Sequence, residues 1–322
     1  MYRIGVDLGG TNIAVGLVNE SYQILQKQSL PTNAATRTGE AIADDIALLC
    51  RRVCEAQGIT LAEVDAIGVA SPGVADSEKG EVAYAGNLPF RHFPICALLA
   101  EKTGVASVHV ENDANAAAFG EAVAGAAKGT NNSIMITLGT GVGGGIIIDR
   151  KVYAGFNFAG AELGHMVIER NGAPCSCGRK GCWEAYSSAT GLIRMTKEKI
   201  EECRETGRKT LLVDEVQKRG KVTGRTAFDA MRAGDAAAKE VVDTYLSYLA
   251  IGIGNIINIF QPQVLSIGGG VANEKENLLR PLLPLVSKES FANNFVTPTD
   301  IRIAALGNDA GIIGAAFLGI EE

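Results

Sequence analysis

The 322-residue sequence lacks the features that would assign it to a membrane or to nucleic acid. Its most apolar segment, LAIGIGNIINIF, is interrupted by Asn255 and Asn258 and is shorter than the roughly 20 apolar residues of a membrane-spanning helix. No long basic run occurs, and Lys+Arg 30 against Asp+Glu 36 give a net charge of −6, which disfavours nucleic acid or an anionic membrane as partner. The first residues, MYRIGVDLGG, carry no signal core. We therefore expect a cytoplasmic protein, and the length predicts two domains.

Cysteine is sparse, and its count of seven argues against a complete disulfide framework. Three cysteines gather in HMVIERNGAPCSCGRKGCWEA, where Cys175, Cys177 and Cys182 follow His165. Three thiolates and one imidazole at this spacing are typical of a closed tetrahedral zinc site, although a lone histidine is more often an ordinary core or surface residue. The remaining cysteines are expected to be reduced, packed or surface thiols: Cys50, Cys54, Cys96 and Cys203.

Two segments of the chain share a pattern of strand, glycine-rich bend and second strand. They are VDLGGTNIAVGLVN, residues 6–19, and ITLGTGVGGGIIID, residues 136–149. Leu8 and Gly9 of the first correspond to Leu138 and Gly139 of the second. Two such hairpins predict a duplicated domain with a cleft between its halves.

Both bends have the composition of a phosphate site, because glycine lets successive backbone N–H groups approach an anion. Thr11, Thr137 and Thr140 add hydroxyl donors. The alternative is that both are simply tight hairpin turns. The second bend contains the dinucleotide pattern G-x-G-x-x-G, but that pattern must open a helix, and GIIIDRKV reads as a strand. A third cluster, Gly268–Gly270, ends another strand after a long amphipathic helix and could lie beside a nucleotide base or ribose.

Two aspartates follow predicted strands. Asp113 stands between the strand VHVEN and an alanine-rich helix, at or near the helix N-cap. It could cap the helix or act as the base for a substrate hydroxyl. Asp7 precedes the first bend and could orient a hydrated Mg²⁺ on a nucleotide.

Taken in order along the chain, five motifs resemble those of the ROK family of sugar kinases, most closely its bacterial glucokinases. They are D-x-G-G-T at residues 7–11, E-N-D-A-N at 111–115, G-T-G-V-G-G-G at 139–145, E-x-G-H at 162–165 and C-x-C-G-x-x-G-C-x-E at 175–184. The resemblance implies the actin-like, hexokinase-type ATPase fold, with two α/β domains that bind sugar between them and close on it. The implied small domain spans residues 1–120 with the last helix, about 307–322, and the large domain spans 121–306.

The resemblance also implies a role for individual residues. Asp113 is the expected base that takes the proton of the attacking sugar hydroxyl. The other expected sugar contacts are Gly73, Asn87, Asn112, Glu162, His165 and Glu184. The expected ATP contacts are Asp7, Gly9, Gly10, Thr11, Asn12, Thr137, Gly139, Thr140, Gly141, Gly143, Gly268, Gly269 and Gly270. The implied cofactors are ATP, Mg²⁺ and a structural Zn²⁺ on His165, Cys175, Cys177 and Cys182, and the family implies a homodimer or homotetramer.

Two departures from the family pattern bear on these expectations. Asn12 stands where many relatives carry lysine, which removes a cation from the first bend, and NLPFRHF at residues 87–93 lacks a tryptophan common in glucokinases. Other hexoses or N-acetylhexosamines therefore stay open as substrates: N-acetylglucosamine, N-acetylmannosamine, fructose, mannose or allose. The remaining alternatives are a zinc-ribbon module and a sugar-responsive repressor, and the early D-x-G-G-T hairpin leaves no room for the helix-turn-helix that such repressors carry ahead of it.

Overall fold

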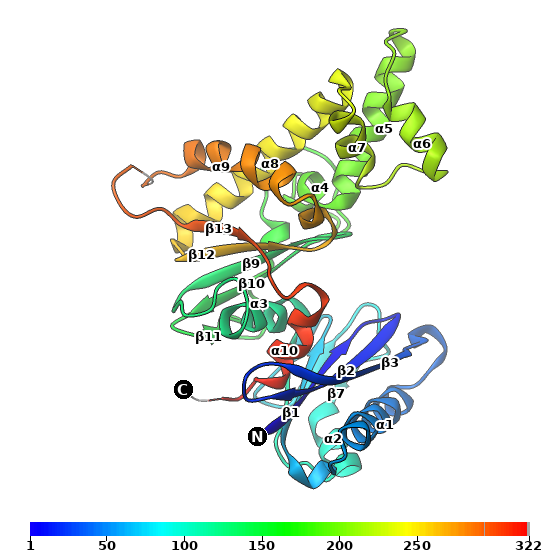
Figure 1. The fold of residues 1–322 in the computed structure, drawn as a ribbon, viewed down its shortest axis with the longest axis vertical. Coiled ribbons are helices and arrows are strands. Elements are labelled where there is room, and N and C mark those ends of the chain that lie inside the picture. Colours follow the sequence, from blue (N-terminus) through cyan, green and yellow to red (C-terminus); the bar gives the residue numbers. More distant parts are fainter. Residues whose placement is uncertain (293, 321–322) are drawn as a thin grey trace. The chain divides into compact units, whose positions relative to one another are not determined.

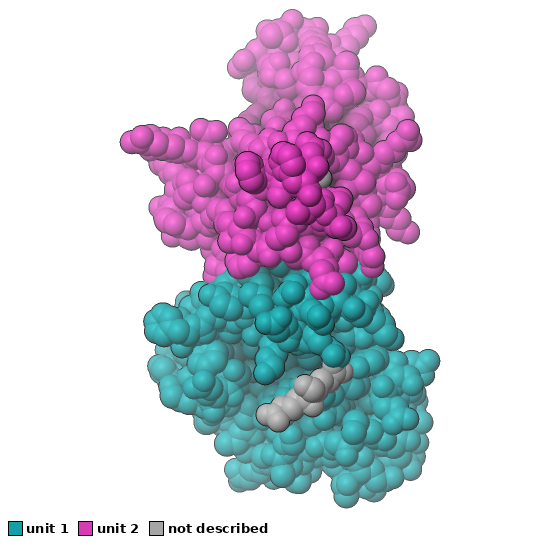
Figure 2. All heavy atoms as spheres, turned by 90° about the vertical axis from the view of Figure 1, so that its left-hand side faces the viewer, with its two compact units in different colours: residues 1–135, 145–161, 305–322 teal, residues 136–144, 162–304 magenta. Residues whose placement is uncertain are grey.

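A computed structural model describes residues 1–320 except residue 293. Within these residues the chain divides into two compact units (Figure 2). Unit 1 comprises residues 1–135 and 145–161 and the C-terminal segment from Ala305, and unit 2 comprises residues 136–144 and 162–304. No helix in the described part of the chain is both long and apolar enough to cross a membrane.

The first hairpin forms the centre of a five-stranded sheet in unit 1 (Figure 1). The order is β3-β2-β1-β4-β8, in which β1–β2 and β2–β3 pair antiparallel and β1–β4 and β4–β8 pair parallel. The strands are β1 (Tyr2–Leu8), β2 (Asn12–Asn19), β3 (Ile24–Pro31), β4 (Val64–Ser71) and β8 (Val108–Asn112). A smaller antiparallel sheet of unit 1 contains β5 (Val74–Asp76), β6 (Glu81–Tyr84) and β7 (Arg91–Phe93).

The second hairpin has the same place in a second five-stranded sheet, whose order is β11-β10-β9-β12-β13. Its strands are β9 (Ser133–Leu138), β10 (Val142–Ile148), β11 (Lys151–Val152), β12 (Val264–Gly268) and β13 (Asp300–Ile303). In both sheets the hairpin continues into a third strand on one side, and a strand from much later in the sequence lies beside its first strand on the other. The two hairpins thus occupy corresponding positions in sheets of the same strand order.

The α-helices among the described residues of unit 1 are α1 (Gly39–Gln57), α2 (Ile95–Thr103), α3 (Asp113–Val123) and α10 (Ala310–Ala316). Thr38 caps α1 by accepting the N–H of Ala41, and the apolar face of this helix packs into a core that also contains Ile4, Val6 and Ile67. The short turns η1 (Ala34–Thr36), η2 (Leu61–Glu63) and η5 (Gly307–Asp309) connect these elements.

The C-terminal helix α10 returns to the first sheet, as predicted, and lies beside α3 (Figure 1). Its approach is so close that a Cβ on Gly68 of β4 would lie 1.7 Å from the carbonyl oxygen of Ala315. A Cβ on Gly314 would likewise lie 1.7 Å from the carbonyl oxygen of Ala116 in α3. Both positions therefore require glycine. The contact at Gly314 packs the C-terminal helix α10 directly against α3, the helix that begins with Asp113.

The helices of unit 2 are α4 (Glu184–Ser187), α5 (Ala189–Glu205), α6 (Leu212–Arg219), α7 (Thr226–Arg232), α8 (Ala236–Phe260) and α9 (Glu276–Glu289), with the turns η3 (Leu163–His165) and η4 (Gly270–Glu274). The longest, α8, begins at the N-cap Asp235, whose side chain accepts the N–H of Ala238. Its predicted apolar face is buried at Tyr245, Leu249 and Ile253. It therefore forms the core of the helical part of unit 2, against α5, α7 and α9.

Candidate active site and metal centre

The first glycine bend, between β1 and β2, is a tight loop that is held by hydrogen bonds from Thr32, the residue after β3. The N–H of Gly9 donates to the carbonyl oxygen of Asn12 at 2.9 Å. Thr32, which is fully buried, donates its hydroxyl to the carbonyl oxygen of Gly9 and its N–H to that of Thr11. The side chains of Thr11 and Asn12 are exposed. The loop thus has a fixed backbone and freely accessible polar groups, which is what an anion site requires.

Asp7 ends β1 next to this bend, in an environment that disfavours its charge. Burial, reinforced by the negative charge of Asp113 and opposed by Lys27, raises the pKa of Asp7 to about 6. Lys27 of β3 also pairs with Asp309 at 2.5 Å. The structure therefore brings Asp7 and Asp113 close enough to interact, and it supplies a cation, Lys27, that the sequence motifs did not indicate.

Replacing Asp7 by asparagine should stabilise the protein at neutral pH in the absence of Mg²⁺. Since the folded-state pKa is raised, the unfolded chain releases this proton first as pH rises from about 3.9 to about 6, so the wild type loses stability through that window. Asparagine has no such loss. We expect the variant's advantage in unfolding free energy to be about 2 kcal/mol larger at pH 7.5 than at pH 4.5, measured by urea unfolding.

The control for this experiment is Asp65→Asn, which removes an exposed carboxylate of the same unit that accepts the N–H of Tyr2. Asp65→Asn should not stabilise the protein at pH 7.5, because it removes an exposed hydrogen-bond acceptor and no buried group. An Asp7→Asn advantage that is the same at both pH values would contradict the raised pKa of Asp7.

Asn112, rather than Asp113, is the N-cap of α3. The Asn112 Oδ1 accepts the N–H groups of Ala114 and Asn115 at 2.9 and 3.2 Å, because its backbone is still extended while Asp113 is already helical. The Asn112 Nδ2 donates to the carbonyl oxygen of Gly73 at 3.0 Å. The capping role that the sequence suggested for Asp113 is therefore filled mainly by Asn112.

Asp113 is exposed at the first position of α3. Its Oδ1 accepts the N–H of Ala114 at 2.8 Å. Desolvation by the surrounding protein nevertheless raises the pKa of Asp113, and this backbone hydrogen bond only partly opposes the shift. A positioned, accessible carboxylate with a raised pKa has the properties of a general base.

The other predicted sugar contacts of unit 1 lie beside these groups. Gly73 has φ = 90°, and a Cβ there would lie 2.0 Å from the carbonyl oxygen of Tyr84, so only glycine fits. A Cβ on Gly10 would lie 2.9 Å from the carbonyl oxygen of Asn87 and 3.1 Å from its Nδ2. Asn87 is thus in contact with the first glycine bend, and Gly73 is hydrogen-bonded to the cap of α3.

In unit 2, the second glycine bend is held by the start of α5. Gly139 closes the bend by donating its N–H to the carbonyl oxygen of Gly141 at 3.0 Å. The N–H of Ala189 donates to the carbonyl oxygen of Gly139, and the hydroxyl of Thr190 donates to that of Thr140 at 2.7 Å. Thr137 and Gly143 lie on the strands that flank the bend. The hairpin turn is therefore confirmed, and tertiary hydrogen bonds fix its backbone.

The third glycine cluster lies against this second bend. Gly268 is the last residue of β12, and Gly269 follows with φ = 83°, where a Cβ would lie 2.6 Å from the backbone of Leu138. A Cβ on Gly139 or Gly270 would meet no atom within 4 Å. Two glycine segments that are distant in sequence thus lie against each other, and each has a glycine whose Cα faces open space.

Glu184 connects the cysteine-rich loop to the second glycine bend. Its Oε2 accepts the N–H of Val142 at 3.1 Å, and its Oε1 accepts the hydroxyl of Ser176 at 3.0 Å. A Cβ on Gly141 would lie only 2.1 Å from Oε2, so a glycine in the bend makes room for this carboxylate. The structure therefore shows a bracing role for Glu184 that the sequence did not indicate.

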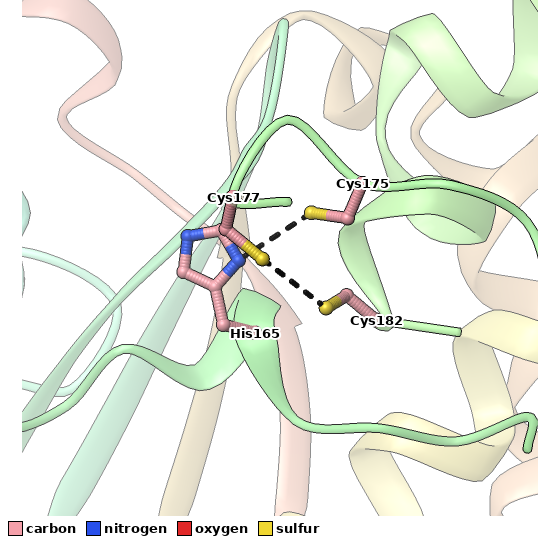
Figure 3. Close-up of side chains that lie close together, drawn as sticks. All are labelled: His165, Cys175, Cys177 and Cys182. Carbon is pink, nitrogen blue, oxygen red and sulfur yellow. Dashed lines mark hydrogen bonds between the residues drawn. The ribbon is translucent and has the colours of Figure 1, made fainter. Parts of the chain in front are cut away.

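His165, Cys175, Cys177 and Cys182 come together as predicted, with one ligand atom from each residue within 4.8 Å of all the others (Figure 3). The Sγ atoms of Cys177 and Cys182 are 3.7 Å apart, and the His165 Nδ1 lies 3.6 Å from the Cys175 Sγ. Zinc bonds of about 2.3 Å to sulfur and 2.0–2.1 Å to nitrogen in a tetrahedron give edges of about 3.8 and 3.6 Å. The spacing of these atoms fits a closed Cys₃His metal site.

The local fold that gathers the four ligands is a short irregular loop. The N–H of Cys175 donates to the carbonyl oxygen of Arg179 at 2.9 Å, and the N–H of Gly178 to that of Cys175 at 3.0 Å. An isolated β-bridge pairs Val167 with Cys182. The backbone N–H of Arg179, aided by its guanidinium, lowers the pKa of Cys177 to about 6. The loop thus favours a thiolate at its exposed cysteine.

The two ring nitrogens of His165 point in different directions (Figure 3). Nδ1 faces the Cys175 sulfur, whereas Nε2 lies 4.0 Å from the Oε2 of Glu162, which is largely exposed. One nitrogen can therefore bind a metal while the other stays available, together with Glu162, for a ligand outside the cluster.

Two residues are important for the structure although no sequence motif indicated their role. Glu121 of α3 is completely buried, and its carboxylate accepts the N–H groups of Ala126, Ala305 and Leu306. It therefore fastens the chain ahead of α10 to α3, and its only sequence signal is an acid near the end of an alanine-rich helix. Trp183 is fully buried on α8, where its Nε1 donates to the carbonyl oxygen of Tyr248 at 3.0 Å.

The whole chain is similar to sugar kinases of known structure and sequence. The ROK glucokinase of Streptomyces griseus, solved in complex with glucose and AMPPNP, matches with a TM-score of 0.79 and 34% identity over 99% of both chains. The fold is accordingly the actin-like ATPase fold. The glucokinases of Halalkalibacterium halodurans and Thermotoga maritima are 38% and 37% identical, with 98% of this chain and 94% and 96% of theirs covered. The ROK family model matches residues 3–322, and the protein belongs to the ROK family.

Proposed function

We propose that this protein is a sugar kinase that transfers the γ-phosphoryl group of ATP to O6 of glucose. The proposal depends mainly on the Asp113 carboxylate, which is exposed at the start of α3 and has a raised pKa. Its negative charge also raises the pKa of Asp7 at the first glycine bend, so the two carboxylates lie close together. The similarity to glucokinases over nearly the whole chain supports glucose as the substrate.

The phosphoryl transfer is an in-line displacement. The sugar O6 attacks the γ-phosphorus, its proton passes to the carboxylate of Asp113, and the bond from the γ-phosphorus to the bridging oxygen breaks to release ADP. Such transfers require mainly positioning and neutralisation of charge. In each unit we assign phosphate binding to the backbone N–H groups of its own glycine bend, and in unit 2 we assign Gly268–Gly270 to the adenosine. Lys27 reduces the negative charge around Asp7, in a chain that has Asn12 where many relatives carry lysine.

Sugar recognition is assigned separately in each unit. In unit 1 the assigned polar groups are those of Asn87, Asn112 and the Gly73 loop. In unit 2 the resemblance to the ROK family assigns Glu162 and the Nε2 of His165. Glu184 binds sugar only if it exchanges one of its present hydrogen bonds, to Val142 and Ser176, for a sugar hydroxyl.

Two metal ions are part of the proposal. Asp7 would hold a hydrated Mg²⁺ bound to ATP, since Mg²⁺ keeps several waters and uses few carboxylates. His165, Cys175, Cys177 and Cys182 would hold a structural Zn²⁺. A closed site of four protein ligands leaves no position for an activated water, so the zinc ion would order the loop and fix the His165 ring.

A coupled assay of ADP release across hexoses and N-acetylhexosamines tests this function, with zinc-replete protein, ATP and Mg²⁺. We expect glucose to give the highest kcat/KM and the product to be the 6-phosphate. A higher kcat/KM for mannose, fructose, allose or an N-acetylhexosamine would reassign the substrate. The absence of ADP release with every sugar would overturn the kinase assignment itself.

A further inference from the structure

Unit 1 contains a second candidate ligand site, a cavity of about 370 Å³ that the proposed kinase reaction does not use. Phe119 and Val123, one turn apart on the last part of α3, contribute apolar surface. Tyr22 and Phe317 add aromatic rings whose centroids are 4.5 Å apart. This volume falls within the roughly 300–1,000 Å³ of small-molecule pockets, and an apolar wall of this kind is their usual lining.

The charged side chains of the lining are mainly cationic. Among the lining residues that the structure describes, Lys128, Arg150 and Lys151 carry three positive charges and Asp149 carries one negative charge. The ammonium group of Lys128 lies 5.7 Å from the centroid of the Tyr22 ring, an arrangement that stabilises the cation at the aromatic surface. In a protein with a net charge of −6, this local excess of positive charge favours an anion.

The cavity is separate from the proposed catalytic groups. Asp113 is the first residue of α3, and Val123, which lines the cavity, is the last. At about 1.5 Å per residue the helix places them roughly 15 Å apart. A ligand in the cavity would therefore contact the opposite end of the helix that begins with Asp113.

We propose that this cavity binds an amphipathic anion, namely a compact aromatic or aliphatic body that carries a carboxylate, sulfonate or phosphate group. The apolar body contacts Phe119, Val123 and the rings of Tyr22 and Phe317. The anionic group lies at Lys128 and Lys151, at the rim, where both lysines are exposed to solvent. Burial of the body and charge-assisted hydrogen bonds to the lysines together supply the affinity.

Fluorescence titration of the intact, zinc-replete protein with 8-anilino-1-naphthalenesulfonate tests the proposal. We expect saturable binding at one site, and at least tenfold weaker binding of the neutral analogue N-phenyl-1-naphthylamine, because it lacks the sulfonate. The double variant Lys128→Glu/Lys151→Glu should weaken sulfonate binding by about tenfold or more. Val123→Trp, which fills the cavity, should abolish it.

The matched control is Lys197→Glu/Lys221→Glu, the same charge change on two exposed lysines of unit 2, and it should leave binding unchanged. Equal binding by the double variant and the wild type, or loss of binding on Phe291→Ser at a largely exposed phenylalanine elsewhere, would overturn the proposal. Displacement of the probe by glucose plus AMPPNP would place it at the kinase site and would also overturn it. None of these binding measurements depends on kinase activity.

Discussion

Asp113→Asn should lower kcat for sugar phosphorylation by about 10²–10⁴, the usual contribution of a general base, and should change KM for the sugar much less. Asparagine is nearly the same size and keeps an oxygen for the N–H of Ala114, but it cannot accept the proton of the sugar hydroxyl. The helix should keep its cap, since Asn112 provides it. Steady-state kinetics with saturating MgATP measure both parameters.

A thermal melt separates this catalytic effect from a structural one. Asp113→Asn should melt within a few degrees of the wild type, whereas Asn112→Ala removes the cap and the hydrogen bond to Gly73, and should lose about 1 kcal/mol or more of stability. Near-normal kcat in Asp113→Asn would reduce Asp113 to a structural residue. Because the pKa of Asp113 is raised, wild-type kcat/KM should also decline on the acidic side at a higher pH than an ordinary aspartate would give.

Cys177→Ala should lower bound zinc from one ion per chain to well below one, and should raise KM for the sugar by tenfold or more. Three ligands leave the tetrahedral site open, and Cys177 is the exposed ligand whose thiolate the loop itself stabilises. Without the metal, the His165 ring loses the bond that would hold Nδ1 toward the sulfurs. Metal analysis by mass spectrometry and sugar kinetics under reducing conditions measure the two effects.

The effect on ATP should be smaller but measurable, since Glu184 links Ser176 of the metal loop to Val142 at the second glycine bend. Cys96→Ala is the matched control, because this thiol lies in α2, outside the cluster, and it should leave zinc content and KM for sugar unchanged. Active wild-type protein without zinc would refute the metal assignment. Normal sugar kinetics in zinc-free Cys177→Ala would show that the metal has no role in sugar binding.

The parts of the site that follow from neighbouring residues were predictable from the sequence. The hairpins and their glycine bends follow from alternation of strand and turn residues, and the Cys₃His cluster follows from ligand spacing over 18 residues, His165 to Cys182. The helix after Asn112 was also predictable. Its cap was less so, because both Asn112 and Asp113 are residue types that cap well, and only the backbone conformation decides between them.

The sequence by itself determined which chemical groups are present: two glycine bends, a candidate base, a set of metal ligands and the motif order of the ROK family. These features depend on turn geometry and on ligand spacing, which act over a few residues. The tertiary structure alone decided that Glu184 braces the second bend, that Glu121 fastens the chain before α10 to α3, and that Asp7, Lys27 and Asp113 share one electrostatic environment. Each of these joins residues that are far apart in the sequence, and the physical reason is the same: a pKa or a hydrogen bond depends on which distant groups folding brings within a few ångströms, information that no local pattern contains.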